Sequence, residues 1–304
     1  MRKFFLILIV LISFAGAGLA QEREITTSDS VQLYVKIKGT GTPCLYLHGG
    51  PGSGSYWLEK FFGDYLEQRF QMIYLDQRGV GRSSSPKDKN YSPDRMTRDF
   101  EEVRQALGIR QWLTLGHSFG GILQMAYVTK YSKSVKGMIM INCTLSMKES
   151  FCNSWIPKAA ELGGVCYTMP DTSSPDSIFN KMMEVAKAME EKGARWKMAF
   201  SDEKNDSVMN STYSGFSKWN GDFGSVALNI QDYWKDCRAE TSGVKVPVLF
   251  YYGYSDWMVG PKHYEGVKFP KMMLWGSEVG HMPFLENRAD LERAIDKYIV
   301  KYKF

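Results

Sequence analysis

The sequence predicts an α/β fold with a mostly parallel central sheet, and three observations carry this prediction. Short apolar runs with the length and composition of buried strands alternate with segments of helical periodicity. A glycine-rich turn at 116–121 joins one such run, 111–115, to an amphipathic segment. Two later apolar runs end in polar loops at 253–256 and 276–281. Reactive groups gather at the carboxyl ends of parallel strands, so these loops are expected to share one sheet edge.

The individual elements follow from local patterns along the chain. Residues 31–38 alternate between apolar and polar types, which predicts an early antiparallel strand. Apolar residues recur at helical spacing from Met96 to Leu107, behind Ser92 as a capping residue. Buried strands are expected at 44–47, 71–75, 111–115, 136–142, 246–252 and 271–275.

The alternation of strands and helices stops after about residue 145 and resumes near 243. Residues 146–242 contain methionine- and aromatic-rich helical stretches, such as 178–189, and polar loops, such as 201–210. We therefore expect a helical cap at 146–242, inserted between two parts of the core at 21–145 and 243–304.

Ser118 lies in a G-x-S-x-G turn between a predicted strand and a predicted helix. This arrangement is the nucleophile elbow of the α/β-hydrolase fold, in which the residues beside the serine must be small. Gly116 and Gly120 meet that requirement. The sequence therefore predicts that Ser118 is a nucleophile, and the alternative is a surface serine in a glycine-rich turn.

The partners of Ser118 are predicted from their order along the chain. In this fold the acid follows the serine and the histidine follows the acid. Asp256 and His281 have this order, and each lies in a loop after a predicted strand. We expect His281 to accept the serine proton and Asp256 to orient the imidazole. A turn-forming aspartate and a structural histidine are the alternatives.

An acyl-transfer site also needs hydrogen-bond donors for the developing oxyanion. The glycine-rich loop 48–52 follows a predicted buried strand, in the position that supplies one such donor in this fold. We assign the backbone N–H groups of Gly50 and Phe119 to this role. The side chain of His48 is expected to brace the loop.

Three motifs together resemble the proline iminopeptidase (prolyl aminopeptidase) family of serine peptidases. They are H-G-G-P-G at 48–52, D-Q-R-G-V-G-R-S at 76–83 and the elbow, followed by the loops that end at Asp256 and His281. The resemblance covers roughly 45–145 and 245–300, and it implies the triad Ser118, Asp256 and His281. The elbow departs from the family's usual G-G-S-W-G, because His117 and Phe119 flank the serine here.

The middle of the chain departs from the family as well. The family's W-x-x-W-E element supplies an acid that grips the substrate amine, and the nearest segment here is 216–220, with Asn220 in the place of the acid. Other cap acids that would suit an amine are usually solvated. They are Glu161, Glu184, Glu190, Glu191 and Glu203.

The resemblance implies release of an N-terminal residue, often proline, from short peptides. A carboxylesterase or related hydrolase of small esters or amides is the first alternative, favoured by the elbow and by Asn220. A binding protein on the same scaffold is a further alternative, because fold does not fix function. Aspartate-dependent dehalogenases and epoxide hydrolases are disfavoured by the serine at 118.

The first twenty residues have the pattern of a cleaved secretory signal. Arg2 and Lys3 precede an apolar run from Phe4 to Phe14, and Ala17-Gly18-Leu19-Ala20 form a small-residue cleavage region. The protein is therefore expected to be secreted or periplasmic, with no membrane contact after cleavage; a retained N-terminal anchor is the alternative. The formal net charge is +5, and no basic cluster predicts nucleic-acid binding.

The chain has five cysteines, and the expected export of the protein decides whether they could form a disulfide. Cys44 and Cys143 fall on predicted core strands and are expected to be buried thiols. An oxidising compartment would allow one disulfide among Cys152, Cys166 and Cys237. No metal-ligand spacing, phosphate loop or dinucleotide motif occurs, so no metal or cofactor is predicted. The oligomeric state is not predicted.

Overall fold

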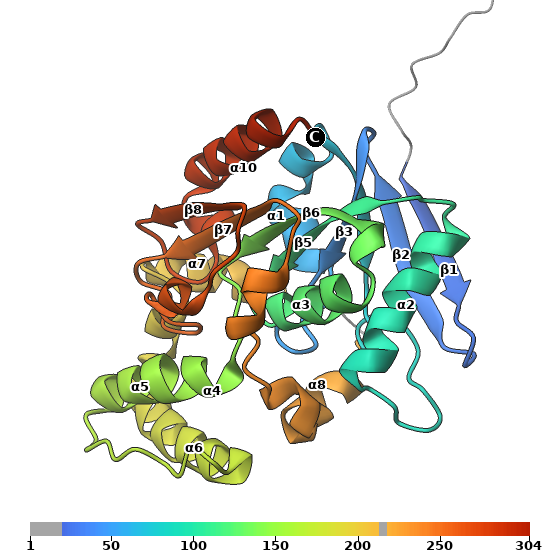
Figure 1. Cartoon of the computed structure of the whole chain (residues 1–304). Helices are drawn as coiled ribbons and strands as arrows, with labels where there is room; N and C mark the ends of the chain where they lie inside the picture. Colours follow the sequence, from blue (N-terminus) through green and yellow to red (C-terminus); the bar gives the residue numbers. More distant parts are fainter. Residues whose placement is uncertain (1–19, 213–217) are drawn as a thin grey trace, which may run out of the picture.

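A computed structural model describes residues 20–212 and 218–304 of the chain. Its described residues form an eight-stranded sheet in the order β1-β2-β4-β3-β5-β6-β7-β8 (Figure 1). β1 pairs with β2 and β2 with β4 in antiparallel fashion, and all the remaining pairs are parallel. The mostly parallel sheet predicted from the sequence is confirmed. The predicted signal segment lies outside the described residues, except for Ala20.

The strands match the predicted apolar runs to within a few residues. They are β1 (Gln21–Thr26), β2 (Gln32–Lys38), β3 (Thr42–Leu47), β4 (Phe70–Leu75), β5 (Trp112–His117), β6 (Val135–Ile141), β7 (Val248–Gly253) and β8 (Met272–Ser277). The antiparallel strand predicted at 31–38 is β2, and the first strand of the sheet, β1, was not predicted.

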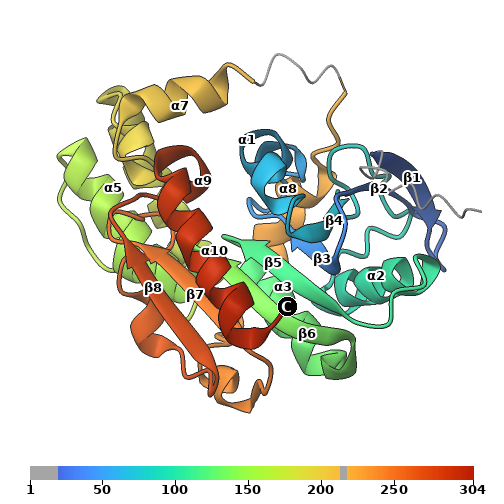
Figure 2. The same ribbon diagram turned by 90° about the horizontal axis from the view of Figure 1, so that it is seen from above.

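The helices of the core lie in two layers, one on each face of the sheet (Figure 2). α1 (Tyr56–Leu66) and α10 (Arg288–Tyr302) pack on one face, and α2 (Pro93–Ala106) and α3 (Gly120–Lys130) pack on the other. Successive strand residues point to opposite faces, so strand residues alternate between the two buried apolar clusters. The predicted cap at Ser92 is present, since its side chain accepts a hydrogen bond from the N–H of Arg95.

Short helices complete the core at both ends of the parallel strands. They are η1 (Ser132–Ser134), η8 (His263–Gly266) and α9 (Pro283–Glu286).

The segment between β6 and β7 corresponds to the predicted cap and is called the insertion below. Its described residues form helices and turns and add no strand to the sheet. Figure 1 shows α4 to α6 at the lower left and α8 below α3. These elements are α4 (Met147–Ser150), the π-helical turn η2 (Phe151–Trp155), α5 (Ile156–Gly163), α6 (Pro175–Glu191), η3 (Arg195–Met198), α7 (Glu203–Asn210), α8 (Asp222–Val226), η5 (Ala227–Asn229), η6 (Gln231–Trp234) and η7 (Ala239–Gly243). The exact limits 146 and 242 stay a prediction.

The prediction of a polar loop at 201–210 is wrong, because α7 occupies most of this segment. The helix has no buried residue, so it lacks the apolar periodicity from which helices are recognised. Its start is stabilised instead by Asp202, whose side chain accepts a hydrogen bond from the N–H of Lys204.

Candidate active site

Ser118 lies in the sharp turn between β5 and α3 and has a left-handed backbone, with φ at +56°. A non-glycine residue adopts this conformation only where its surroundings enforce it. The start of α3 is pressed against neighbouring backbone, since a Cβ on Gly120 would lie 2.1 Å from the carbonyl oxygen of Leu47. The strained backbone at Ser118 and the glycine that follows have the geometry expected for a nucleophile elbow.

His281 and Asp256 are brought together after β8 and β7. His281 Nδ1 lies 3.0 Å from Asp256 Oδ1, and both side chains are buried. The same carboxylate oxygen accepts the N–H groups of Met258 and Val259, at 3.1 Å each, which fixes its position. An ionised carboxylate oxygen can only accept a hydrogen bond, so Nδ1 of His281 carries the proton. The other ring nitrogen, Nε2, is then the one with a free lone pair.

The loop of His281 lies beside the elbow. His117 is the residue before Ser118. Its Nε2 lies 2.9 Å from the carbonyl oxygen of His281, and the centroids of the two imidazole rings are 4.7 Å apart. Burial, and secondarily the nearby His281, lower the pKa of His117 to about 3. The neutral His117 ring therefore donates its Nε2–H to the loop of His281. This contact explains a histidine where the related motif has glycine.

The loop after β3 passes directly over the elbow. A Cβ on Gly49 would lie 2.6 Å from Ser118 Cβ, and Gly50 has a φ of +109° that glycine alone adopts readily. Within 20–212 and 218–304, the N–H groups of Gly50 and Phe119 have no hydrogen-bond acceptor. Both predicted oxyanion donors are therefore free of protein partners in that part of the chain.

The side chain of Phe119 is fixed by a buried aromatic cluster. Its ring centroid lies 5.0 Å from that of Tyr233 and 5.9 Å from that of Phe223, both in edge-to-face geometry. The Tyr233 hydroxyl donates to the carbonyl oxygen of Tyr91, 2.6 Å away. The insertion thus holds the side chain of Phe119, the residue that follows Ser118.

The D-Q-R-G-V-G-R-S motif braces the glycine-rich loop. The buried Asp76 carboxylate accepts the N–H and hydroxyl of Ser55, at 2.9 and 2.8 Å, and the guanidinium of Arg82. Burial alone would raise its pKa, but the contacts with Arg82 and Ser55 hold the pKa of Asp76 below its usual value. Gln77 contacts His48 at both its backbone and its side chain, so His48 has the bracing contacts expected of it.

Asn220 has a structural role in this fold. Its amide Nδ2 donates to the carbonyl oxygen of Ser83 at 3.0 Å and to Ser85 Oγ at 2.9 Å, while its Oδ1 accepts the N–H of Asp222. These bonds use both ends of the amide and hold the insertion against the 76–83 motif. Asn220 is therefore not placed to bind a substrate amine; Phe216 and Ser217 of the same predicted segment lie outside the described residues.

The predicted amine-binding acids of the insertion occupy its outer faces. Glu161, Glu184 and Glu190 pair with cationic side chains three to five residues away in the chain. Glu191 and Glu203 are exposed. The described structure thus gives none of these five the burial expected for a ligand-binding carboxylate.

All five cysteines are unpaired, so the disulfide considered for Cys152, Cys166 and Cys237 is not formed. Cys44 and Cys143 are buried as predicted, and burial raises the pKa of both thiols.

Among the described residues, no group of His, Cys, Asp and Glu side chains has the arrangement of a metal site. No helix in that same portion is long and apolar enough to cross a membrane.

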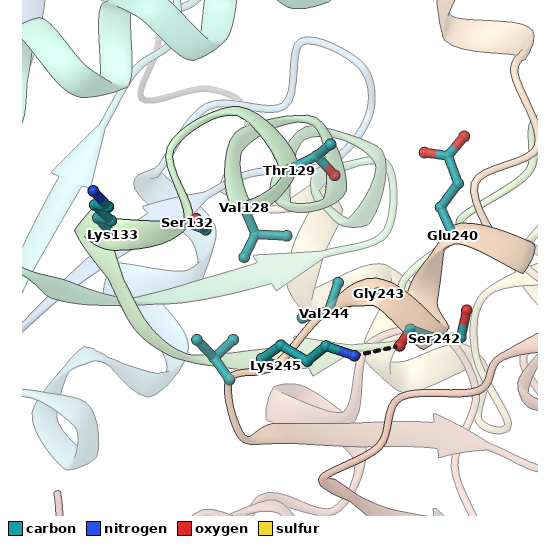
Figure 3. Close-up of a pocket in the computed structure, with 10 residues that line it drawn as sticks. Val128, Thr129, Ser132, Lys133, Glu240, Ser242, Gly243, Val244 and Lys245 are labelled. Carbon is teal, nitrogen blue, oxygen red and sulfur yellow. Dashed lines mark hydrogen bonds between the residues drawn. The ribbon is translucent and has the colours of Figure 1, made fainter.

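A cavity of about 720 Å³ lies away from these residues (Figure 3). Its lining comes from the end of α3, from η1 and from 240–246, which precede β6 and β7 in the chain. It therefore opens at the amino ends of the parallel strands, whereas Ser118, Asp256 and His281 follow their carboxyl ends.

The fold defines the class of protein first. The chain has the α/β-hydrolase fold, and the family model described as alpha/beta hydrolase fold matches residues 42–163. Among solved structures, the proline iminopeptidase-related protein of Thermus thermophilus superposes with a TM-score of 0.78 at 21% identity, covering 93% of this chain and 98% of that one. An esterase from Exiguobacterium antarcticum superposes at 0.69 with 21% identity, covering 92% and 100%. At these identities the likeness shows the fold alone.

Curated proline iminopeptidases align with this chain at higher sequence identity than these solved structures do. The chain is 32% identical to a proline iminopeptidase of Neisseria gonorrhoeae over 151 residues, which is 48% of this chain and 46% of the relative. It is 37% identical to one from Lactobacillus delbrueckii subsp. lactis over 124 residues, or 38% of this chain and 42% of the relative. The resemblance predicted from the motifs is confirmed, and the alignments span less than half of these relatives.

Proposed function

We propose that this protein is a serine hydrolase of the proline iminopeptidase type, which releases the first residue of short peptides through Ser118, His281 and Asp256. One observation carries the proposal. The His281–Asp256 contact of 3.0 Å lies at the same sheet edge as a serine with a left-handed elbow backbone. The similarity to curated proline iminopeptidases supports the peptide substrate.

In the proposed reaction, Ser118 Oγ attacks the carbonyl carbon of the first peptide bond while His281 Nε2 takes the hydroxyl proton. The negative charge that develops on the carbonyl oxygen is stabilised by the N–H groups of Gly50 and Phe119. Asp256 stabilises the imidazolium. His281 then gives the proton to the leaving amine, and the first residue stays on Ser118 as an ester. Water, deprotonated by His281, hydrolyses that ester and restores the serine.

The test compares three substrates: prolyl-p-nitroanilide, its N-acetylated form and p-nitrophenyl butyrate. We expect the protein to cleave the free prolyl amide and to lose this activity on N-acetylation. Ser118→Ala is expected to lower kcat by roughly 10⁴-fold or more. Unchanged turnover by Ser118→Ala would show that the serine is not the nucleophile, and equal turnover of the acetylated amide would exclude an aminopeptidase.

A carboxylesterase is the second candidate, and Asn220 favours it. Its amide is fully used in holding the insertion, so this segment offers no carboxylate to a substrate amine. Esters and amides share the same tetrahedral intermediate, so the catalytic residues suit both. Serine-dependent cleavage of the butyrate ester well above that of any aminoacyl amide would establish this function instead.

We also propose that residues 1–20 direct export and are then removed. The support is their sequence: a basic start, an apolar run and small residues before Gln21. Mass spectrometry of the protein purified from its natural host should find an N-terminus at Gln21, in the extracytoplasmic fraction. Recovery of the intact N-terminus in a membrane fraction would show a retained anchor.

A further inference from the structure

The loop that carries His281 is held on several sides by hydrogen bonds. The N–H of His281 donates to the carbonyl oxygen of Ala199, 2.7 Å away, and its own carbonyl oxygen accepts His117 Nε2. The carbonyl oxygen of Gly280 accepts Asn142 Nδ2 at 2.6 Å. The backbone of His281 is therefore bonded to the insertion on one side and to the elbow on the other.

Glu286, the last residue of α9, joins the same loop to the insertion through both carboxylate oxygens. Its Oε1 accepts the N–H of Gly280 at 3.0 Å and that of Met282 at 3.4 Å, on either side of His281. Its Oε2 accepts the N–H of Ser201 at 2.8 Å and also the Ser201 hydroxyl. One side chain thus links the residues that flank His281 to the insertion.

The two segments also touch directly, backbone against backbone. A Cβ on Gly280 would lie 2.5 Å from the carbonyl oxygen of Ala199 and 2.9 Å from Glu286 Oε1. There is no room for a side chain between them. A displacement of residues 199–201 therefore acts on the backbone of His281, whereas Asp256 fixes only the Nδ1 end of the ring.

We propose that Glu286 is a positioning residue that couples the insertion segment 199–201 to the placement of the His281 imidazole. The inference rests on the proposed function, because it takes His281 as the base. A reacting group displaced by about 1 Å can lose about 100-fold in rate. The insertion segment would then set the rate of the chemical step through the histidine, rather than only the affinity for substrate.

The chemistry of a carboxylate makes the proposal testable. Glu286 accepts N–H groups at both oxygens, whereas glutamine has a single acceptor oxygen and keeps one side of the bridge. Both Glu286→Ala and Glu286→Gln remove the negative charge. A difference between these two variants therefore reports the hydrogen bonds and not the charge.

We expect Glu286→Ala to lower kcat about 10- to 100-fold, with KM changed by less than about threefold, because the base is misplaced while the substrate pocket is kept. Glu286→Gln should show a clearly smaller loss. Glu292→Gln, which alters an ion pair with Arg288 on α10, is the matched control and should stay near wild type.

Gly280→Ala tests the same coupling with Glu286 intact. Its Cβ would press on Ala199, and we expect a loss in kcat of the same order as for Glu286→Ala. Ser201→Ala removes only the hydroxyl donor on the insertion side and should lower kcat slightly. If Glu286→Ala does not accumulate as folded protein, Glu286→Gln, which keeps one side of the bridge, and Gly280→Ala, which leaves Glu286 intact, carry the test.

The outcomes separate this inference from the function on which it rests. An active His281→Ala variant would overturn the proposed function itself. An inactive His281→Ala variant together with wild-type kcat in Glu286→Ala would overturn the positioning role alone. Equal losses of kcat in Glu286→Ala and Glu286→Gln would show a charge effect and would also overturn it.

Discussion

At the scale of single residues, the site combines a backbone that is costly to form with contacts that hold it. Ser118 has a φ of +56°, a conformation that a residue with a side chain rarely adopts. The glycines around it allow the necessary close approach, since a Cβ on Gly121 would lie 2.6 Å from Cys143 Cβ. Such strain persists only where the surroundings enforce it, and here it projects the serine from the sheet edge.

Gly120→Ala is expected to disrupt the elbow, because the added methyl group would lie 2.1 Å from the carbonyl oxygen of Leu47. Backbone at that distance must shift, and the N–H of Phe119 would shift with it. We expect a free energy of unfolding lower by about 1–3 kcal/mol, the range for overpacking, and a loss of serine-dependent activity. Urea unfolding and turnover of the preferred substrate measure both effects.

Gly243→Ala is the control for this prediction, because no atom lies within 4 Å of a Cβ placed there. It should unfold within about 0.5 kcal/mol of wild type, as surface substitutions usually do. Equal stability and activity in Gly120→Ala would contradict the proposed geometry of the elbow.

The sequence was informative about residues whose signal is local. Ser118 stands in a motif, and Asp256 and His281 follow strands in a fixed order. Glu286 carries no such signal, because its contact with Ser201 spans 85 residues of the chain. The contact from His117 to the carbonyl oxygen of His281 spans 164 residues and likewise depends on how the finished sheet places its loops.

At the scale of elements, the connection from β4 to α2 acts as a structural brace. Arg78 is fully buried, and its guanidinium bonds the carboxylates of Asp99 and Asp29 and the carbonyl oxygen of Asn90. Asp99 is itself buried on α2 and is also bonded by Arg95. These contacts tie the loop after β4 to α2 and to the start of the sheet.

Arg78→Ala is expected to lower the free energy of unfolding by about 3–5 kcal/mol, because it leaves the buried carboxylate of Asp99 without its main partner. Arg98→Ala is the matched control, since Arg98 on α2 is mostly exposed and pairs with Glu102. That exposed pair should contribute no more than about 1 kcal/mol. Urea midpoints measure both, and similar midpoints for the two variants would contradict the brace.

The predicted strands and the helix at 96–107 have an apolar pattern, although α1 and α10 have one as well and were not predicted individually. The buried strands matched because each is a short apolar run. β1 has only one buried residue, Ile25, and is formed by pairing with β2, so its own sequence carries almost no strand signal. α7 was missed for the same reason, because all of its residues face solvent or are half-buried.

At the scale of the whole molecule, the fold gathers every proposed reactive group at one edge of the sheet. Three of the four histidines of the chain are held there or nearby in buried, uncharged form. Burial lowers the pKa of His48 to about 4, that of His117 to about 3 and that of His263 to about 4. Each neutral ring serves as a fixed hydrogen-bond partner for the surrounding loops.

These histidines make the stability of the protein depend on pH. An unfolded histidine binds a proton near pH 6.5, whereas these three stay unprotonated in the folded state until about pH 4 or below. Their contribution to stability is therefore complete above pH 6.5 and is lost as the pH falls toward 4. Each histidine adds up to about 1.4 kcal/mol per pH unit to the slope within this window.

His263→Gln tests this prediction away from the proposed catalytic residues. His263 Nε2 accepts the N–H of Leu145 at 2.9 Å, and a glutamine oxygen can accept the same group. We expect urea unfolding between pH 6.5 and 4.5 to show a shallower loss of stability in the variant, by up to about 1.4 kcal/mol per pH unit. Lys187→Gln, at an exposed position on α6, should leave the slope unchanged. A wild-type slope in His263→Gln would show that the buried imidazole at 263 takes up its proton in the folded protein as readily as in the unfolded chain.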